Sequence, residues 1–271
     1  MPQSPQTTNA TKVEQLIDHL LTEMPQYREQ AADFTTPEER RRLLRSLMNV
    51  RPPLPLDPAF VALQDEVLSE ECTERGIVHV ADIPSSPVDP RIALWQGDIV
   101  RLDADAIVNA ANDALLGCFY PCHGCIDNAI HSAAGLELRD ACARIMNDQG
   151  HPEATGTAKI TPAFNLPSRY VLHTVGPIVR NGHPTQRDRD LLASCYTSCL
   201  ELVCANNLHS IAFCCISTGE FGYPNEPAAE VAVATVRAFL ATHESYDLKV
   251  VFNVFKDLDR RIYERLLGYD N

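Results

Sequence analysis

Four side chains that bind soft or borderline metal ions occur within eight residues of this sequence: Cys118, Cys122, His123 and Cys125. Zn²⁺ in proteins takes thiolate and imidazole ligands in tetrahedral geometry. Because Cys122 and His123 are adjacent, their side chains diverge in an extended loop, so we expect only one of them to reach the ion. Three protein ligands leave a fourth position for water or substrate, as in catalytic zinc sites. A closed structural site with four ligands and clustering without metal are the alternatives.

A carboxylate follows this cluster at the start of an expected helix, residues 126–134. Asp127 lies in the first turn of that helix, and His131 lies one turn later on the same face. If the helix N-terminus points at a ligand, Asp127 can orient or deprotonate a water or a hydroxyl group. Alternatively, Asp127 only complements the helix dipole. His131 is expected to have a structural role.

Polar side chains also end two strand-like apolar runs. Asp98 follows residues 92–95, and its carboxylate can accept a hydrogen bond from an exocyclic amine. Asn109 and Asn112 end the run that begins at Ala106, and their amides can bind hydroxyl groups or position a water. Ordinary turn and capping chemistry is the alternative for each of them. Together these residues predict a polar site at the carboxyl ends of strands.

A loop rich in small residues follows another strand-like run, residues 211–214. Gly219 and Gly222 permit close approach of the loop backbone to a phosphate group. Pro224 can open the helix that follows. The loop is not a Walker loop, because it lacks the Gly-Lys-Ser/Thr ending. The interpretation of this loop as a phosphate site is supported by the other strand-end loops, which complement it.

The order of the elements indicates the fold class. From about Arg91, short apolar runs alternate with helical stretches, which predicts an α/β sandwich with a mixed, mostly parallel sheet and helices on both faces. Ligands of such sheets bind beyond the carboxyl ends of the strands, where the loops above lie. The expected strands are residues 92–95, 106–108, 157–161, 170–173, 211–214 and 249–253, and the expected helices are residues 126–134, 136–148, 187–205, 226–242 and 257–267.

Residues 1–90 are expected to form a helical N-terminal extension to a domain that spans residues 91–271. Thr36 and Pro37 are typical of a helix N-cap and first helical position. Asp57 precedes a further expected helix. The extension contains no candidate catalytic cluster, so we expect it to act as a packing lid or a docking surface.

The formal net charge of −13 argues against a nucleic acid as the main partner, because phosphate contacts need clustered lysine and arginine. It does not exclude a small phosphate ligand held by backbone N–H groups. Residues 1–11 do not resemble a targeting segment, and no apolar run approaches the roughly 20 residues of a membrane-spanning helix. We therefore expect a soluble, cytoplasmic protein that binds no membrane. Cysteines such as Cys199 and Cys214 are expected to be free and buried.

The strand-end loops together resemble those of the macrodomain family of ADP-ribose-binding modules. Gln96-Gly-Asp-Ile is similar to the family's adenine-contacting segment, and Val108-Asn-Ala-Ala-Asn is similar to its ribose-contacting segment. Ile216-Ser-Thr-Gly-Glu-Phe-Gly-Tyr-Pro is similar to its diphosphate loop, and His173-Thr-Val-Gly-Pro matches the segment between them. The motifs follow the family's order over residues 91–267. The resemblance implies a three-layer α/β/α sandwich.

The segment before Asp127 departs from the run of glycines that many macrodomains have there. The run Cys-Phe-Tyr-Pro-Cys-His-Gly-Cys is similar to that of the zinc-dependent microbial subgroup, whose members are ADP-ribosyl hydrolases with a helical N-terminal extension. The resemblance implies that Cys118, His123 and Cys125 ligate Zn²⁺ beside the distal ribose. It implies that Cys122 is the unused thiol.

The resemblance also implies an activity, namely hydrolysis of the bond between the distal ribose and a modified protein side chain, with release of ADP-ribose. An aspartate or glutamate ester is the expected linkage, and Asp127, Asn109 and Asn112 are the expected catalytic residues. The expected partners are a mono-ADP-ribosylated protein and the ADP-ribosyltransferase that modifies it. A non-catalytic ADP-ribose reader with a structural zinc and an O-acyl-ADP-ribose deacylase are the alternatives. The expected ligand-binding residues are Asp98, Ile99, Asn109, Asn112, Ser217, Thr218, Gly219, Glu220, Phe221 and Gly222.

Overall fold

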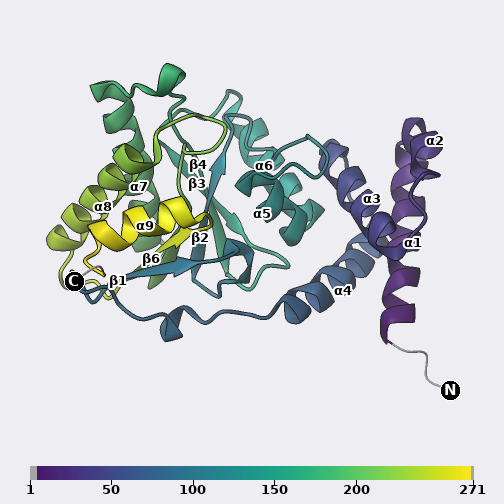
Figure 1. Ribbon diagram of the computed structural model, residues 1–271. Helices are drawn as coiled ribbons and strands as arrows, with labels where there is room; N and C mark the ends of the chain where they lie inside the picture. Colours follow the sequence, from purple (N-terminus) through teal and green to yellow (C-terminus); the bar gives the residue numbers. More distant parts are fainter. Residues whose placement is uncertain (1–4, 270–271) are drawn as a thin grey trace.

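The computed structural model describes residues 5–269. Residues 1–4 of the predicted N-terminal extension and residues 270–271 of the predicted second domain lie outside the described residues. A six-stranded sheet forms the middle of the main body (Figure 1). Its strands are β1 (Ile92–Gln96), β2 (Ala106–Ala111), β3 (Ala158–Pro162), β4 (Tyr170–Val175), β5 (Ser210–Phe213) and β6 (Lys249–Val254). Each expected strand is therefore present, with its ends shifted by a few residues.

The strand order is β1-β6-β5-β2-β4-β3, and every neighbouring pair is parallel except the antiparallel pair β3 and β4. The predicted mixed, mostly parallel sheet is confirmed. The inner strands are mostly apolar because helices cover both faces of the sheet, and Asn109, His173 and Asn253 are polar exceptions. Since β1, β2, β5 and β6 run in the same direction, the loops that follow them meet at one edge of the sheet.

Two groups of helices cover the sheet. Helices α5 (Ile126–Ala134) and α6 (Leu136–Gln149) lie on one side, and α7 (Gln186–Ala205), α8 (Asn225–Thr242) and α9 (Asp257–Leu266) lie together on the other (Figure 1). This is the predicted three-layer sandwich. Short 3₁₀ turns span Pro25–Tyr27, Val80–Asp82, Ile99–Arg101 and Arg180–Gly182.

The N-terminal helices are α1 (Pro5–Glu23), α2 (Arg28–Ala31), α3 (Pro37–Val50) and α4 (Pro58–Arg75). They lie beyond α5, on the side away from the sheet (Figure 1), and α3 and α4 contact α5. Thr36 caps α3 in a capping box with Glu39, and the Asp57 side chain caps α4, as the sequence predicts. Their apolar faces form a core of their own, which includes Leu16, Leu20 and Leu47.

The predicted division between residues 90 and 91 stays a prediction. Val80 and Ile83 precede it in the chain, yet both pack into the core of the sandwich rather than into the core of the N-terminal helices. Among the described residues, none of the helices combines the length and the apolar character that crossing a membrane would need.

Candidate functional site

A cavity of about 610 Å³ lies at the edge of the sheet where the loops after β1, β2, β5 and β6 converge. Its walls come from all the loops that the sequence singled out. Of the predicted site residues, the cavity is lined by Asp98, Ile99, Asn112, Cys118, His123, Cys125, Asp127, Ser217, Thr218, Gly219, Glu220 and Phe221. Asn109 and Gly222 do not line it.

Three of the four predicted metal donors converge at one end of this cavity. The ligand atoms of Cys118, His123 and Cys125 all lie within 4.8 Å of one another, and Cys118 Sγ lies 3.7 Å from His123 Nδ1. Cys125 is also the N-cap of α5, where its Sγ accepts a hydrogen bond from the Asn128 N–H at 3.4 Å. Burial raises the pKa of Cys125 to about 12, and the hydrogen bond from the Asn128 N–H opposes that rise. Two thiols and an imidazole are a donor set that suits Zn²⁺.

Cys122 is turned away from this group. Its backbone adopts a positive φ of 52°, and its Sγ lies 3.2 Å from Ser46 Oγ and donates to the Arg42 carbonyl at 3.6 Å. The His123 N–H donates to the Tyr120 carbonyl at 3.2 Å in this turn, and Cys122 lies against α3 while His123 lies with the other donors. The sequence left open whether Cys122 or His123 joins the donor group, and in the structure His123 does.

Helix α3 holds the outer side of the donor loop. The Asn49 side chain is 2% exposed, accepts a hydrogen bond from the Cys122 N–H at 2.9 Å and donates to Ser132 Oγ at 3.0 Å. Arg45 donates to Asn128 Oδ1 at 2.7 Å, and the Asn128 amide donates to the Tyr120 carbonyl at 3.0 Å. The loop is thus bonded to α5 and to the N-terminal helices together.

Arg139 holds the start of the same loop from α6. Its guanidinium donates to the carbonyls of Leu116 at 2.7 Å and Met48 at 2.8 Å, and it lies 4.4 Å from the centre of the Phe119 ring. Burial lowers the pKa of Arg139 to about 10, against the opposing effect of the Asp127 carboxylate. This arginine therefore stays charged at neutral pH beside the site.

Asp127 faces the cavity from the first turn of α5 and is 5% exposed. Its carboxylate accepts hydrogen bonds from the Asn109 amide at 2.8 Å and the Asn112 amide at 3.5 Å, and it lies 3.5 Å from His131 Nε2. Burial raises the pKa of Asp127 to about 6, although the Asn109 hydrogen bond and the Arg139 charge lower it. A carboxyl group in this state is suited to proton transfer near neutral pH.

Asn109 was predicted to contact the ligand, but its side chain is fully buried. It lies beneath Asp127, with its amide 3.2 Å from His173 Nδ1. Residues 109 and 112 lie on the same strand and its continuation, and the odd spacing between them sends their side chains in different directions. The Asn109 amide donates to Asp127, whereas Asn112 lines the cavity.

The loop after β5 offers unused backbone donors. Among the described residues, the N–H groups of Gly219, Glu220 and Phe221 donate to no protein acceptor. Ser217, at the start of this turn, has a φ of 66°, and residues 219–221 line the cavity. Gly222 closes the turn behind them at a φ of 68°, where a Cβ atom would lie 2.9 Å from the Val179 carbonyl. Successive free N–H groups in such a turn form an anion-binding concavity.

Comparisons with known proteins agree with this geometry. The Macro domain profile matches residues 108–232. A "Protein-ADP-ribose hydrolase" of Treponema medium is 53% identical over 93% of this chain and 97% of its own length, and a protein of that name from Staphylococcus aureus is 44% identical over 94% and 96%. The chain belongs to the macrodomain family. A solved Trypanosoma brucei macrodomain in complex with ADP-ribose superposes with a TM-score of 0.64 at 34% identity, covering 82% of this chain and 95% of that one.

The macrodomain cavity is also lined by residues that the sequence reasoning missed. Asp98 lies there as predicted, but its carboxylate also accepts from the Val100 N–H at 3.2 Å, so the capping interpretation holds as well. Asn253, Phe255 and Lys256 line the cavity as well, and Phe255 is 73% exposed. All three follow or end the strand-like run of residues 249–253, which is the signal that would have identified them.

A second group of metal-binding residue types lies behind Asp127. Donor atoms of His131, Cys142 and His173 lie within 4.8 Å of one another, but all three residues are buried and none lines the cavity. His173 Nε2 is already bonded to Thr161 Oγ1 at 2.9 Å. Burial lowers the pKa of both histidines, which keeps them neutral. This group is packing around the Asp127 carboxylate.

Proposed function

We propose that this macrodomain is a zinc-dependent protein-ADP-ribose hydrolase that removes mono-ADP-ribose from modified aspartate or glutamate side chains and releases ADP-ribose. The names of its relatives from Treponema medium and Staphylococcus aureus support the activity. One observation supports the proposal that this activity depends on zinc. The donor group Cys118, His123 and Cys125 and the buried carboxylate of Asp127 line the same end of one cavity.

The cavity suits an extended ligand with ADP-ribose chemistry. Asp98 and Phe255 provide a hydrogen-bond acceptor and an exposed ring for adenine at one end. The free N–H groups of residues 219–221, which line the same cavity, suit the diphosphate. The distal ribose is then left with Asn112 and Asp127 beside the donor group.

The donor group fits zinc by chemistry and by spacing, because two thiols and one imidazole are brought within reach of one ion. The third cysteine of the segment, Cys122, contacts Ser46 instead. When bound there, Zn²⁺ supplies Lewis-acid polarisation of ribosyl or ester oxygens and lowers the pKa of a bound water. The resemblance to the zinc-dependent microbial subgroup supports this choice of metal.

The protein's own groups account for the positioning of the nucleophile. Asn109 and Asn112 hold the two oxygens of Asp127, and the carboxylate is oriented into the cavity by these two amides. We assign to Asp127 the placement of a water against C1″ of the distal ribose and the acceptance of its proton. The water oxygen bonds to C1″ while the bond from C1″ to the side-chain oxygen breaks, and the freed side chain leaves as a carboxylate.

The test is the release of ADP-ribose from a protein modified on aspartate or glutamate, measured with and without 1,10-phenanthroline, together with the metal content of the purified protein. The proposal expects about one zinc per chain, turnover that stops with the chelator, and recovery when zinc is added back. Tight ADP-ribose binding without turnover would show a reader instead. Faster cleavage of O-acetyl-ADP-ribose than of the modified protein would show a deacylase.

A further inference from the structure

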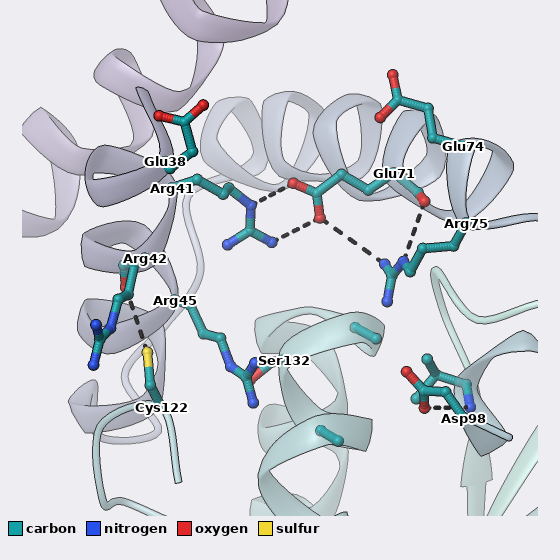
Figure 2. Close-up of a pocket in the computed structure, with 13 residues that line it drawn as sticks. Glu38, Arg41, Arg42, Arg45, Glu71, Glu74, Arg75, Asp98, Cys122 and Ser132 are labelled. Atoms are coloured by element: carbon teal, nitrogen blue, oxygen red, sulfur yellow. Dashed lines mark hydrogen bonds and ion pairs between the residues drawn. The ribbon is translucent and has the colours of Figure 1, made fainter. Parts of the chain in front are cut away.

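A second cavity, of about 750 Å³, lies between the N-terminal helices and α5 (Figure 2). Charged side chains of α3 and α4 form its walls, and small residues of α5 form its floor. It adjoins the first cavity at Asp98 and Ala129, which line both. Cys122 of the donor loop lines it as well. It is therefore next to the candidate active site without being part of it.

Guanidinium groups dominate the inside of this cavity. Arg41, Arg45 and Arg75 point into the space above α5, whereas the carboxylates of Glu38 and Glu74 point away from it (Figure 2). The spacing explains the arrangement, because Arg41 and Arg45 lie four residues apart on one face of α3. We call these three residues the arginine pocket.

The charges in the arginine pocket are only partly neutralised. Arg41 Nη2 donates to Glu71 Oε2 at 2.8 Å, and Arg75 Nη2 lies 3.9 Å from the same oxygen, so two guanidinium groups share one carboxylate. Arg45 is bonded to Asn128 Oδ1, which is a neutral amide oxygen. The carboxylate of Asp98 also faces the cavity (Figure 2), so Arg41, Arg45 and Arg75 are opposed there by two carboxylates, those of Glu71 and Asp98. One more positive than negative charge therefore faces the cavity.

Such a pocket suits carboxylates, because guanidinium groups bind them through paired, charge-assisted hydrogen bonds. The chain as a whole has a net charge of −13, so its remaining surface repels an acidic partner. A local cluster of arginines overcomes that repulsion at one place. The volume of the cavity is much greater than one carboxylate or phosphate group needs, which favours a segment of polypeptide over a small anion.

We propose that the arginine pocket binds an acidic segment of the protein that carries the ADP-ribose. The inference rests on the proposed function, which places the modified side chain at the donor-loop end of the first cavity. From there, the neighbouring residues of the substrate protein pass over the donor loop at Cys122 and enter the space between α3 and α4. Recognition of the protein and of its ADP-ribose then uses two adjoining sites.

Binding of an unmodified peptide tests the pocket independently of catalysis. The probe is a fluorescein-labelled peptide of alternating glutamate and serine, measured by anisotropy on the full chain, with a glutamine-serine peptide as its neutral counterpart. We expect the acidic peptide alone to bind, and its affinity to fall with added salt. Arg75→Gln should weaken binding about two- to fivefold, the range of one exposed charge pair. Equal binding of the two peptides, or binding of inorganic phosphate but not of the acidic peptide, would overturn the proposal.

Two further variants guard against an effect on folding. Glu71→Gln removes the carboxylate that Arg41 and Arg75 share, so it should strengthen binding of the acidic peptide, also about two- to fivefold. Arg144→Gln is the matched control, because Arg144 is an exposed arginine of α6 whose partner Asp140 lies one turn away. It should leave peptide binding unchanged. Weaker binding in Glu71→Gln, or equal loss in Arg144→Gln, would contradict a specific pocket.

Kinetics on modified peptides separate this inference from the proposed function. Two peptides with the same ADP-ribosylated glutamate, one with acidic and one with neutral flanking residues, should share a kcat and differ in KM. Arg75→Gln should raise KM for the acidic peptide only. Turnover of both with the same KM would refute the pocket and leave the hydrolase intact. Absence of turnover with intact acidic-peptide binding would refute the hydrolase alone.

Discussion

Replacing Asn49 with alanine is expected to weaken zinc binding, although Asn49 lies on α3 and is not a member of the donor group. Its side chain accepts from the Cys122 N–H at 2.9 Å and donates to Ser132 Oγ at 3.0 Å. The first bond fixes the donor loop between Cys118 and His123. The second joins α3 to α5. Asn49→Ala removes both without changing any metal ligand.

The size of the effect follows from the two bonds. Each contributes about 1 kcal/mol to stability, so the variant should lose about 2 kcal/mol of unfolding free energy. Only the bond to Cys122 holds the loop in its metal-binding arrangement. A loss of about 1 kcal/mol there raises the Kd for zinc by up to about fivefold, since 1.4 kcal/mol corresponds to tenfold.

Competition with a chromophoric chelator measures the zinc affinity, and thermal unfolding of the metal-free protein measures stability. Asn165→Ala is the matched control, because the Asn165 amide also joins an N-terminal helix to α5, through Asp65 at 2.7 Å and the Ala134 carbonyl at 3.1 Å. It should lose stability but retain the zinc affinity of the parent. If both variants bind zinc as the parent does, the donor loop does not depend on α3 and the reasoning is refuted.

Three further predictions concern single side chains. Cys118→Ala should lose zinc and turnover, whereas Cys122→Ala should retain zinc by elemental analysis, and loss of metal in the latter would overturn the ligand assignment. Asp127→Asn should lower kcat by about 10²- to 10⁴-fold with little change in ADP-ribose affinity by calorimetry, and equal falls in both would make Asp127 a binding residue only. Glu23→Gln should lose about 1–3 kcal/mol at pH 7, because it leaves the buried guanidinium of Arg51 short of a partner. The Arg51 hydrogen bond lowers the pKa of Glu23, so this stabilisation is present above the usual glutamate pKa and disappears as the pH falls through the lowered value. Urea unfolding at pH 7 and at acidic pH should show that difference shrink, and a constant difference would contradict the assignment.

Much of the fold could be predicted because its signals are local. The strands are mostly apolar runs, as expected where helices cover both faces, and turn residues separate them from the helices. The caps of α3 and α4 depend on Thr36 and Asp57, each adjacent to its own helix. The ends of the strands were less well defined, because β2 continues to Ala111 through the polar side chain of Asn109. The burial of Asn109 depends on contact with α5, and the sequence around Asn109 does not show that contact.

The candidate site divides in the same way. The donors Cys118, His123 and Cys125 lie in one short loop, so their proximity follows from their spacing. The groups that hold the loop lie far away in the chain. The sequence of a helix does not show which distant residue one of its polar side chains contacts. Asn49 and Arg139 were missed for that reason, although both are buried.

Helix α3 lies against the donor loop, and none of the described residues that line the first cavity comes from the N-terminal helices. A lid would contact the mouth of the cavity, but α3 instead bonds to the back of the donor loop through Asn49 and to the first turns of α5 through Arg45. Those same turns present Asp127 to the cavity. A shift of α3 would therefore move the donor loop and the carboxylate together. The arginine pocket lies between α3 and α4. An acidic segment bound there would therefore contact α3, the helix that is bonded both to the donor loop and to the helix that carries Asp127.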